Sequence, residues 1–523
     1  MNYDYIVVGA GSTGCAVAAR LSERSHLQVL LLEAGGPDSE PNIHIPAAFP
    51  ALGNTAVDWA YFTEPQSHCN NRVDYVPRGK VFGGSSSINA MIYQRGNPAN
   101  YNRWAELGNE GWSWEEVLPY FKKAQHQERG QSQYHAQGGA INVADLRDPN
   151  PLSLAFVDAC AEQQLPLNAD FNGATQEGFG LYQVTQKNGM RCSAAVGYLH
   201  PALMRPNLAA ITNALVLRLL FTANRCTGVV YRKDGEDHLA EANREVILCG
   251  GAINSPQLLM LSGIGPKAHL EALGIEVRLD LPGVGQNLQD HLMVGVAYHC
   301  TQPISLAAAN TPEQVAKLQN EGKGMLTSNV AEAGGFVKLN PVVAVPELQF
   351  HFIPSWLILH GSVNPGGHGF TLAPGVVDVK SVGALSLRSP NPADPPCINP
   401  NYLAEEADME VLVAGVKLAR RILNSPAFEP YRGEEYLPGA AIESDEEIKE
   451  FIRNYVQTVY HPVGTCKMGN DRMAVVNDRL QVHGIEGLRV ADASIMPFLI
   501  NANTNNPCMM IGEKCADILK KGG

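Results

Sequence analysis

Three glycines near the start of the chain, Gly9, Gly11 and Gly14, have a spacing that suits close approach of the backbone to a phosphate group. The apolar stretch 5–8 precedes them, and a helical pattern follows. Gly9 permits a tight turn from strand to helix, Gly11 allows a pyrophosphate to approach, and Gly14 allows the helix to pack on the strand. The free N–H groups at the start of that helix then attract the phosphates.

A second apolar stretch, 29–32, ends on Glu33. A carboxylate at this position is placed to accept hydrogen bonds from a ribose diol and would repel a 2′-phosphate, so NADP is disfavoured. The order of strand, glycine turn, helix, strand and acid predicts a dinucleotide site. These residues alone leave NAD and FAD open.

Polar residues gather in two later segments. His461 lies between Tyr460 and a Pro-Gly turn, where a side chain is displayed rather than packed, and an imidazole there could act as a general base. Asp492 ends a short apolar stretch, and four asparagines follow within 501–506. This composition favours a polar site over a core. A single histidine is more often structural, so His461 needs further support.

Other chemistries find little support in the sequence. No HExxH or comparable spacing of His, Cys and acids indicates a metal site. The segment 83–87, Gly-Gly-Ser-Ser-Ser, does not fit the GxSxG turn of serine hydrolases. The eleven cysteines are scattered and form no CxxC pair, so we expect reduced thiols and a cytoplasmic location.

The charge balance bears on partners. Lys and Arg number 39 against 52 Asp and Glu, a net charge of −13, so neither a nucleic acid nor an anionic membrane is expected as a partner. No uninterrupted apolar stretch of about 18 residues indicates an integral membrane segment. The sequence does not indicate an oligomeric state.

The expected elements form an α/β chain. Strands return late, at 208–212, 215–221, 226–231 and 245–249, so distant segments must complete the first sheet. From about residue 292 to 402 the pattern changes to strands at 335–339, 347–352 and 383–388, typical of an antiparallel sheet. Helices are expected at 104–124, 151–165, 404–424 and 444–455, and after Ser87.

Five ordered signals together give a family resemblance: Gly9, Gly11 and Gly14 with Glu33; Gly83 to Ser86; Gly251 through Ser255-Pro256 to Gly265; Tyr460-His461-Pro462; and Asp492-Ala493-Ser494 with Asn505 and Pro507. The chain resembles the glucose–methanol–choline (GMC) oxidoreductases, which are FAD-dependent alcohol oxidases and dehydrogenases, and in particular the choline dehydrogenase-like branch. The resemblance covers the chain from end to end.

The resemblance implies a Rossmann-like FAD-binding domain and a discontinuous substrate domain built on an antiparallel sheet with helices. The expected boundaries are 1–150, 190–295 and 485–523 for the FAD-binding domain, and 151–189 and 296–484 for the substrate domain. Ile88 stands where some relatives carry a histidine bonded to the flavin, so non-covalent FAD is expected. Phe82 also departs from the family pattern, which usually has a smaller aliphatic residue there. The residues implied to bind the cofactor are Gly9, Gly11, Ser12, Thr13, Gly14, Glu33, Ala34, Gly83, Ser87, Asn89, Ala90, Met91, Val216, Asp492, Ala493, Asn505, Asn506 and Pro507.

The implied reaction is oxidation of a primary alcohol to the aldehyde, with His461 as the base and hydride passing to flavin N5. Asn505 matches the second catalytic position of the family, where an amide can bind the alcohol oxygen but cannot take its proton. Candidates for substrate contact are Glu332, His351, Trp356, His360 and Tyr460.

Three alternatives to alcohol oxidation remain, and two of them are disfavoured by the sequence. A hydroxynitrile lyase on the same scaffold would keep FAD without using its redox chemistry. A photodecarboxylase acting on fatty acids is disfavoured, because such enzymes use a cysteine in the substrate channel and the segment 348–352 has none. A flavoprotein without activity is disfavoured by the presence of His461 and Asn505. The sequence names neither the alcohol nor the electron acceptor, oxygen or quinone.

Overall fold

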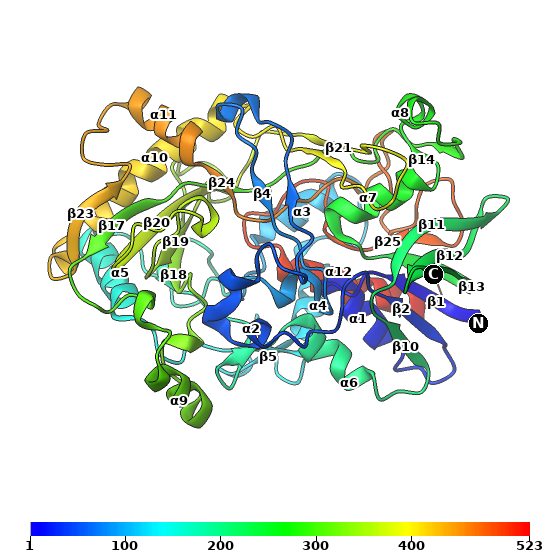
Figure 1. The fold of residues 1–523 in the computed structure, drawn as a ribbon, viewed down its shortest axis with the longest axis horizontal. Helices are drawn as coiled ribbons and strands as arrows, with labels where there is room; N and C mark the ends of the chain where they lie inside the picture. Colours follow the sequence, from blue (N-terminus) through cyan, green and yellow to red (C-terminus); the bar gives the residue numbers. More distant parts are fainter. Residues whose placement is uncertain (1, 523) are drawn as a thin grey trace.

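A computed structural model describes residues 2–522, which build two β-sheets side by side (Figure 1). The first sheet lies on the right of Figure 1 and has the strand order β10-β2-β1-β13-β12-β11, with β25 added on β13. Its strands are β1 Asn2–Val8, β2 Val29–Leu32, β10 Leu208–Ile211, β11 Leu215–Thr222, β12 Arg225–Lys233, β13 Glu236–Leu248 and β25 Leu488–Val490.

The centre of the first sheet is parallel. β1 pairs in parallel with β2 and β13, and β25 pairs in parallel with β13. Helix α1, Ser12–Leu21, connects β1 to β2, as expected for a βαβ unit whose strands are buried on both faces. Strands β11 to β13 form an antiparallel extension. The distant returns expected from the sequence are therefore confirmed.

The second sheet lies on the left of Figure 1 and is antiparallel, with the order β23-β17-β20-β19-β18-β7; β16 joins β20 to β24. Helix α10 packs against β20, and α5 contacts β7, β18 and β19. Buried side chains of this sheet and these helices form a core of their own. Its strands are β7 Gly178–Leu181, β16 Leu292–Met293, β17 Val296–Cys300, β18 Ala333–Val337, β19 Leu348–Ile353, β20 Gly369–Val376, β23 Arg432–Leu437 and β24 Gln457–Thr458.

The helices lie around and between the sheets. Helix α12 packs along α1 and α4, so the last helix described lies beside the first (Figure 1). The helices are α1 Ser12–Leu21, α2 Pro41–His44, α3 Pro98–Glu106, α4 Trp114–Ala124, α5 Pro151–Glu162, α6 His200–Ala202, α7 Gly251–Leu261, α8 Lys267–Ala272, α9 Pro312–Glu321, α10 Glu406–Leu423, α11 Asp445–Tyr455 and α12 Asn505–Lys520. Short strand pairs are β3 Tyr61–Phe62 with β4 Tyr75–Val76, β5 Gln125–Gln127 with β6 Ile141–Val143, β8 Gln186–Lys187 with β9 Met190–Arg191, β14 Ile264–Gly265 with β15 Leu279–Asp280, and β21 Ala384–Ser386 with β22 Cys397–Asn399.

Two local predictions were wrong, and one strand was missed. The expected helix at 104–124 is two helices, α3 and α4, separated by a turn with Gly108 and Gly111 at positive φ. The helix expected after Ser87 does not form: a 3₁₀ turn, Gly84–Ser87, precedes that position, and Met91 has a left-handed backbone. Strand β20 was missed because Pro374 and Gly375 interrupt its pattern. Among the described residues, no helix is long and apolar enough to cross a membrane.

Candidate active site

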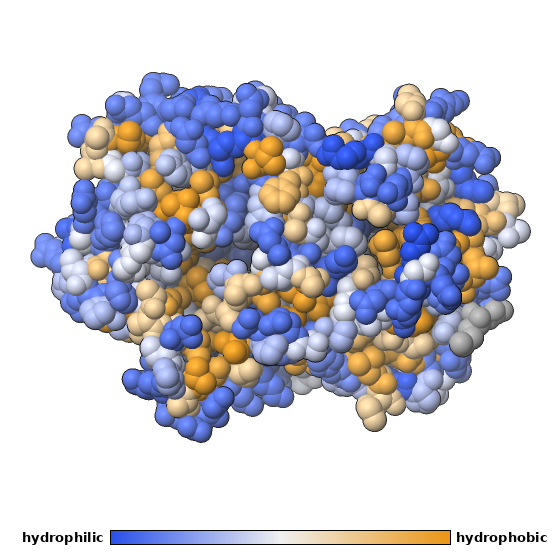
Figure 2. Space-filling view, in the orientation of Figure 1, coloured by the Kyte–Doolittle hydropathy of each residue, from blue (hydrophilic) through white to orange (hydrophobic). Residues whose placement is uncertain are grey.

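One cavity of about 800 Å³ runs from the first sheet to the second. The β1–α1 turn, the end of β2, the start of α7 and the segment after β25 form one part of its wall. Strand β19 with its following loop and the segment after β24 form another part. The face in Figure 2 is hollowed near its middle, between the two halves of the molecule. Residues that are far apart in the sequence, such as Gly9 and His461, therefore line the same cavity.

The glycine turn between β1 and α1 is shaped for close backbone contact. Gly9 has a φ of 99°, in the region that favours glycine, and its N–H donates to the Leu32 carbonyl at 2.8 Å. A Cβ on Gly14 would lie 1.9 Å from the Gly9 carbonyl oxygen. A second glycine loop packs on the first, because a Cβ on Gly84 would lie 2.7 Å from the Gly11 Cα. These approaches leave no space for side chains and form a cradle for a diphosphate.

Glu33 ends β2 with its carboxylate in this cradle. The Ala10 N–H donates to Oε2 at 2.8 Å, and the Gly35 N–H donates to Oε1 at 2.9 Å. Burial, only partly offset by these two donors, raises the pKa of Glu33 to about 7. Ala34 and Val216 line the same end of the cavity. Both oxygens keep a lone pair for the hydroxyls of a ribose, so the residues present fit the adenosine half of FAD.

The raised pKa of Glu33 predicts how pH changes the stability of the protein without its cofactor. Between the unfolded value of 4.5 and about 7, the folded state binds more protons than the unfolded state, so this group makes stability fall as pH rises through that range. The span corresponds to about 3 kcal/mol at most. Melting temperatures of wild type and Glu33→Gln, measured from pH 4.5 to 8, should therefore move apart in this range. Parallel curves would contradict the argument.

Asp492 follows β25 and organises the cavity wall rather than facing a ligand with free oxygens. Oδ2 accepts from the Gly251 N–H at 2.9 Å and from Ser255 Oγ at 2.6 Å, which fixes the start of α7. Oδ1 accepts from the N–H and Oγ of Ser494 at 2.8 and 2.6 Å. Ala493 lies beside it in the wall. Four donors thus satisfy this carboxylate, and it joins two segments that are far apart in sequence.

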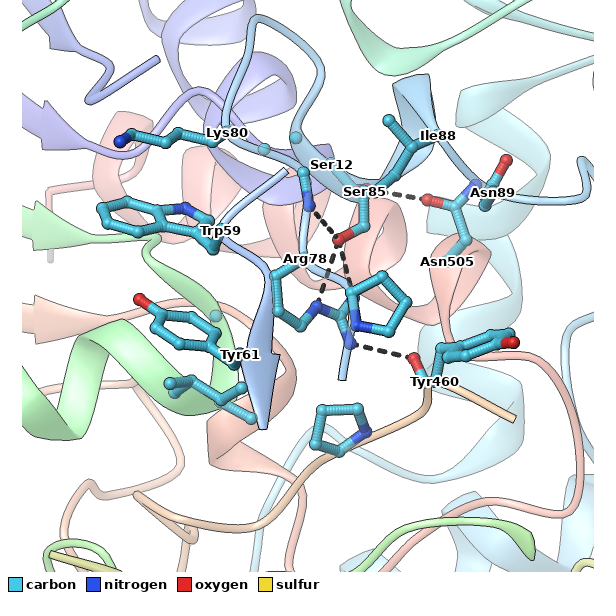
Figure 3. Close-up of a pocket in the computed structure, with 18 of the residues that line it drawn as sticks. Ser12, Trp59, Tyr61, Arg78, Lys80, Ser85, Ile88, Asn89, Tyr460 and Asn505 are labelled. Atoms are coloured by element: carbon cyan, nitrogen blue, oxygen red, sulfur yellow. Dashed lines mark hydrogen bonds between the residues drawn. The ribbon is translucent and has the colours of Figure 1, made fainter. Parts of the chain in front are cut away.

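Arg78 places a half-buried guanidinium in the wall (Figure 3). Its Nε and Nη2 donate to Ser85 Oγ at 3.2 and 2.7 Å, and Nη1 donates to the Tyr460 carbonyl at 2.9 Å. No Asp or Glu in the described chain forms an ion pair with it, and burial lowers its pKa from the usual value. Arginine stays protonated in proteins even so. The carboxylates of Asp290 and Asp58 stabilise this charge from a distance, and the wall carries a positive group next to Tyr460.

His461 lies 8% exposed in the same wall and has three defined contacts. Its N–H donates to Asp290 Oδ1 at 2.8 Å, which holds the backbone. The Nδ1 atoms of His461 and His291 are 2.9 Å apart, and Asn503 Nδ2 lies 3.3 Å from His461 Nε2. Burial lowers the pKa of His461 well below its usual value, with further contributions from His291, His351 and Arg78. The ring is therefore neutral near pH 7.

The turn that displays His461 is held from two sides by carboxylates. Asp290 accepts from Thr458 Oγ1 as well as from His461, and Asp74 Oδ2 accepts from the Thr458 N–H at 2.9 Å. Tyr460, between them, has a φ of 69°, which is uncommon for a residue other than glycine. Its hydroxyl lies 2.8 Å from His360 Nδ1, and His360 Nε2 lies 2.7 Å from Asp74 Oδ1. This network fixes an otherwise strained backbone at the cavity.

The candidate substrate residues separate into two groups. His351, Trp356, His360 and Tyr460 line the cavity. His351 is buried with neither ring nitrogen bonded, and burial lowers its pKa to about 4. Glu332 does not line the cavity: its carboxylate accepts from the Asn150 N–H and from the hydroxyls of Ser153 and Ser328, and so anchors the start of α5.

The cofactor candidates also separate by position. Asn505, in the first turn of α12, lines the cavity, and its Oδ1 accepts from Ser12 Oγ at 2.7 Å (Figure 3). The other cofactor candidates that line the cavity are Gly9, Gly11, Ser12, Thr13, Glu33, Ala34, Asn89, Ala90, Met91, Val216, Asp492 and Ala493. Those that lie behind its wall are Gly14, Gly83, Ser87, Asn506 and Pro507.

Sequence reasoning missed four residues of the site: Arg78, Asp290, His291 and Asn503. Asp290 and His291 stand in a segment that shows only turn and amide composition, and they reach His461 because β16 pairs with β24. The adjacent pair of an acid and a histidine before a short apolar stretch was the available signal. Asn503 was one of four asparagines, and the sequence pattern does not distinguish among them.

A parallel sheet with a diphosphate cradle, joined through one cavity to an antiparallel sheet with a buried neutral histidine, defines a two-domain flavin-dependent oxidoreductase. Family models described as GMC oxidoreductase match residues 3–293 and 379–512, and the chain belongs to that family. The resemblance inferred from the sequence is therefore confirmed, and the proteins of this family are FAD-binding flavoproteins.

Characterised relatives match over nearly the whole chain. Alcohol dehydrogenase (acceptor) of Pseudomonas putida is 47% identical over 99% of this chain and 95% of its own length. Mitochondrial choline dehydrogenase of Homo sapiens is 48% identical over 99% of this chain and 90% of its own length. Among solved structures, pyridoxine 4-oxidase from Mesorbium loti has a TM-score of 0.92 at 31% identity, covering 100% of both chains.

Proposed function

We propose that this protein oxidises a primary alcohol to the aldehyde with non-covalently bound FAD. The observation that carries the proposal is His461, a buried, neutral imidazole in the wall of the cavity that also holds the diphosphate cradle. The family and its relatives supply the reaction class, oxidation of a CH–OH group. FAD, when bound, supplies the acceptor for the hydride that leaves the alcohol carbon.

Two contacts of His461 favour the tautomer that a base requires. The amide N–H of Asn503 is directed at Nε2, which must then offer its lone pair. The two Nδ1 atoms can share only one hydrogen, so His461 Nδ1 carries it and donates to His291. Burial lowers the pKa of His291 to about 3, which keeps that ring neutral and able to accept. Nε2 is thus the unprotonated ring nitrogen, and it takes the hydroxyl proton once the alcohol replaces the Asn503 N–H at its single lone pair.

Asn505 is proposed to hold the alcohol oxygen. Its amide lines the cavity, and its Oδ1 already accepts from Ser12, so its N–H groups remain to donate. His461 and Asn505 then have separate roles: the imidazole removes the proton of the alcohol, and the amide orients its oxygen. Once protonated, His461 stabilises nearby negative charge.

The proposal is tested by mixing the flavin-loaded protein with primary alcohols in the absence of oxygen. Loss of the oxidised flavin absorption and formation of aldehyde are expected. A hydroxynitrile lyase would show no bleaching with any alcohol but would release cyanide from a cyanohydrin. Re-oxidation by air or by a quinone then identifies the electron acceptor; one relative is named for an unspecified acceptor and another as oxygen-dependent.

His291 is expected to influence the rate without touching the alcohol. In His291→Leu the hydrogen on His461 Nδ1 loses its acceptor, at a cost of about 1–3 kcal/mol, and the ring can take the other tautomer. Anaerobic flavin reduction is expected to slow about 10–100-fold. In His291→Asn an amide oxygen can accept again, so part of the rate should return. Equal rates for His291→Leu and wild type would contradict this role.

Three finer statements belong to the same proposal. FAD is not bonded to the chain, since Ile88 offers no nucleophile, so acid precipitation should release all of the flavin. The division into an FAD-binding domain and a substrate domain follows the two sheets, with β16 paired into the second. The cytoplasmic location is supported by the eleven cysteines, all of them free thiols.

A further inference from the structure

The charges around the second part of the cavity indicate which alcohols it takes. We infer that the substrate is an uncharged alcohol with an apolar chain, and that quaternary ammonium alcohols such as choline are poor substrates. The inference rests on the proposed function, because it concerns the group attached to the carbinol that His461 serves.

Carboxylates are missing where a cation would need one. In the described chain, the acids that line the cavity are Glu33, Asp394 and Asp492. Glu33 and Asp492 belong to the first sheet and its turns, where backbone and hydroxyl donors bind them. Asp394 accepts from Ser389 and Asn391, and its carbonyl accepts from Gln257 of α7. None of the three belongs to the second sheet, and Glu332 is bonded away from the cavity.

The acids behind the wall near His461 already accept hydrogen bonds from other groups of the protein. Asp290 accepts from Tyr402, Thr458 and the His461 N–H, and Asp74 accepts from the Thr458 N–H and lies next to His360. The wall that the second sheet and its loops provide is instead mostly apolar. Its residues are Met293, Leu306, Ala309, Val330, Ala331, Ile353, Leu357 and Val459.

Positive charge is already present at this place. Arg78, whose charge Asp290 and Asp58 compensate only from a distance, donates from its guanidinium to the Tyr460 carbonyl, one residue before His461. Proton transfer from the alcohol adds a second positive charge on His461. A quaternary ammonium group would add a further positive charge where no carboxylate of the described chain lines the cavity to contact it, and burying a charge without such a partner is costly. An apolar chain gains from the same surroundings.

The aromatic residues do not replace a carboxylate. A quaternary ammonium can bind between open faces of aromatic rings. Here Trp59 stacks on Tyr61 at 5.6 Å between ring centroids, and Lys80 Nζ lies 4.7 Å from the Trp59 ring centroid (Figure 3). Trp356 packs against Gly369 and the rings of His299 and Tyr436. These rings therefore contact neighbours in the protein, and Lys80 brings a further positive charge to the Trp59 ring.

Choline and its uncharged carbon isostere, dimethylbutanol with a tert-butyl group in place of trimethylammonium, test the inference on the flavin-loaded enzyme. The two alcohols have nearly the same shape, so the ratio of their kcat/KM for anaerobic flavin reduction reports the charge. We expect the isostere to be faster by at least about 100-fold, as for burial of an unpaired charge. A ratio near one, or a preference for choline, overturns the inference and leaves the proposed function standing. Bleaching by no alcohol, including straight-chain primary alcohols, overturns the proposed function and the inference with it.

A charge variant tests the cause of the preference. Met293 lines the cavity on β16, two residues after His291, so Met293→Glu would place a carboxylate in the apolar wall. Met293→Gln is the matched neutral control. Relative to the control, Met293→Glu is expected to shift the ratio toward choline by about tenfold. An unchanged ratio in a flavin-loaded Met293→Glu protein would overturn the electrostatic explanation; if that variant holds no flavin, the wild-type ratio decides.

Discussion

Replacing His461 by alanine is expected to slow reduction of the flavin by an alcohol about 10²–10⁴-fold, while the purified protein stays yellow. The reason is that Nε2 is the proposed proton acceptor in the cavity wall, and alanine leaves only water to take the proton. The cradle around Gly9 and the Glu33 carboxylate do not involve His461, so flavin content should be preserved. Stopped-flow absorbance under anaerobic conditions measures the rate.

His238→Ala is a suitable control for this experiment. His238 lies on β13 in the first sheet, where its ring stacks on Tyr231, and it does not line the cavity. Its replacement should leave the rate of flavin reduction unchanged. A His461→Ala protein that reduces its flavin as fast as wild type would show that another group takes the proton.

The second large effect is expected at Gly14. In Gly14→Ala the new Cβ would lie 1.9 Å from the Gly9 carbonyl oxygen, so β1 and α1 must separate. Such overpacking against backbone costs about 3 kcal/mol, and the cradle changes shape with it. We expect a lower melting temperature and a protein purified without flavin.

Gly11→Ala separates the fold from the cofactor. A Cβ there would meet nothing nearer than the Cys249 carbonyl oxygen, at 3.9 Å, and Gly11 has extended backbone angles that alanine also adopts. The protein without cofactor should keep its stability within about 0.5 kcal/mol. Flavin content should nevertheless fall, because the methyl group occupies space in the wall where the diphosphate approaches. Equal flavin content in both glycine variants and wild type would contradict the assigned cradle.

The cofactor half of the site was predictable because its signals are local. The glycine turn, α1, β2 and Glu33 lie within about thirty residues, and each has a composition that only a few backbone conformations satisfy. The same holds for Asp492, which follows a strand directly. The fold class followed from the change between a helix–strand pattern and alternating strands.

The surroundings of His461 were not predictable in this way. Its contact with His291 joins residues 170 positions apart, and it exists only because β16 and β24 pair in the second sheet. The direction of each side chain determines which of the other candidate residues reach the cavity. Glu332 precedes β18, but its carboxylate points to the start of α5 and not into the cavity. A sequence pattern carries neither kind of information.

The packing of α12 against α1 affects when the protein can acquire its cofactor during synthesis. Ser12 and Thr13 at the cradle bond to Asn505 and to the Cys508 carbonyl, nearly 500 residues later. About 500 residues must therefore be synthesised before these contacts can form, although the glycines of the cradle are synthesised first. FAD capture is then a late step, and chains that stop before α12 should reach the cell's proteases without flavin.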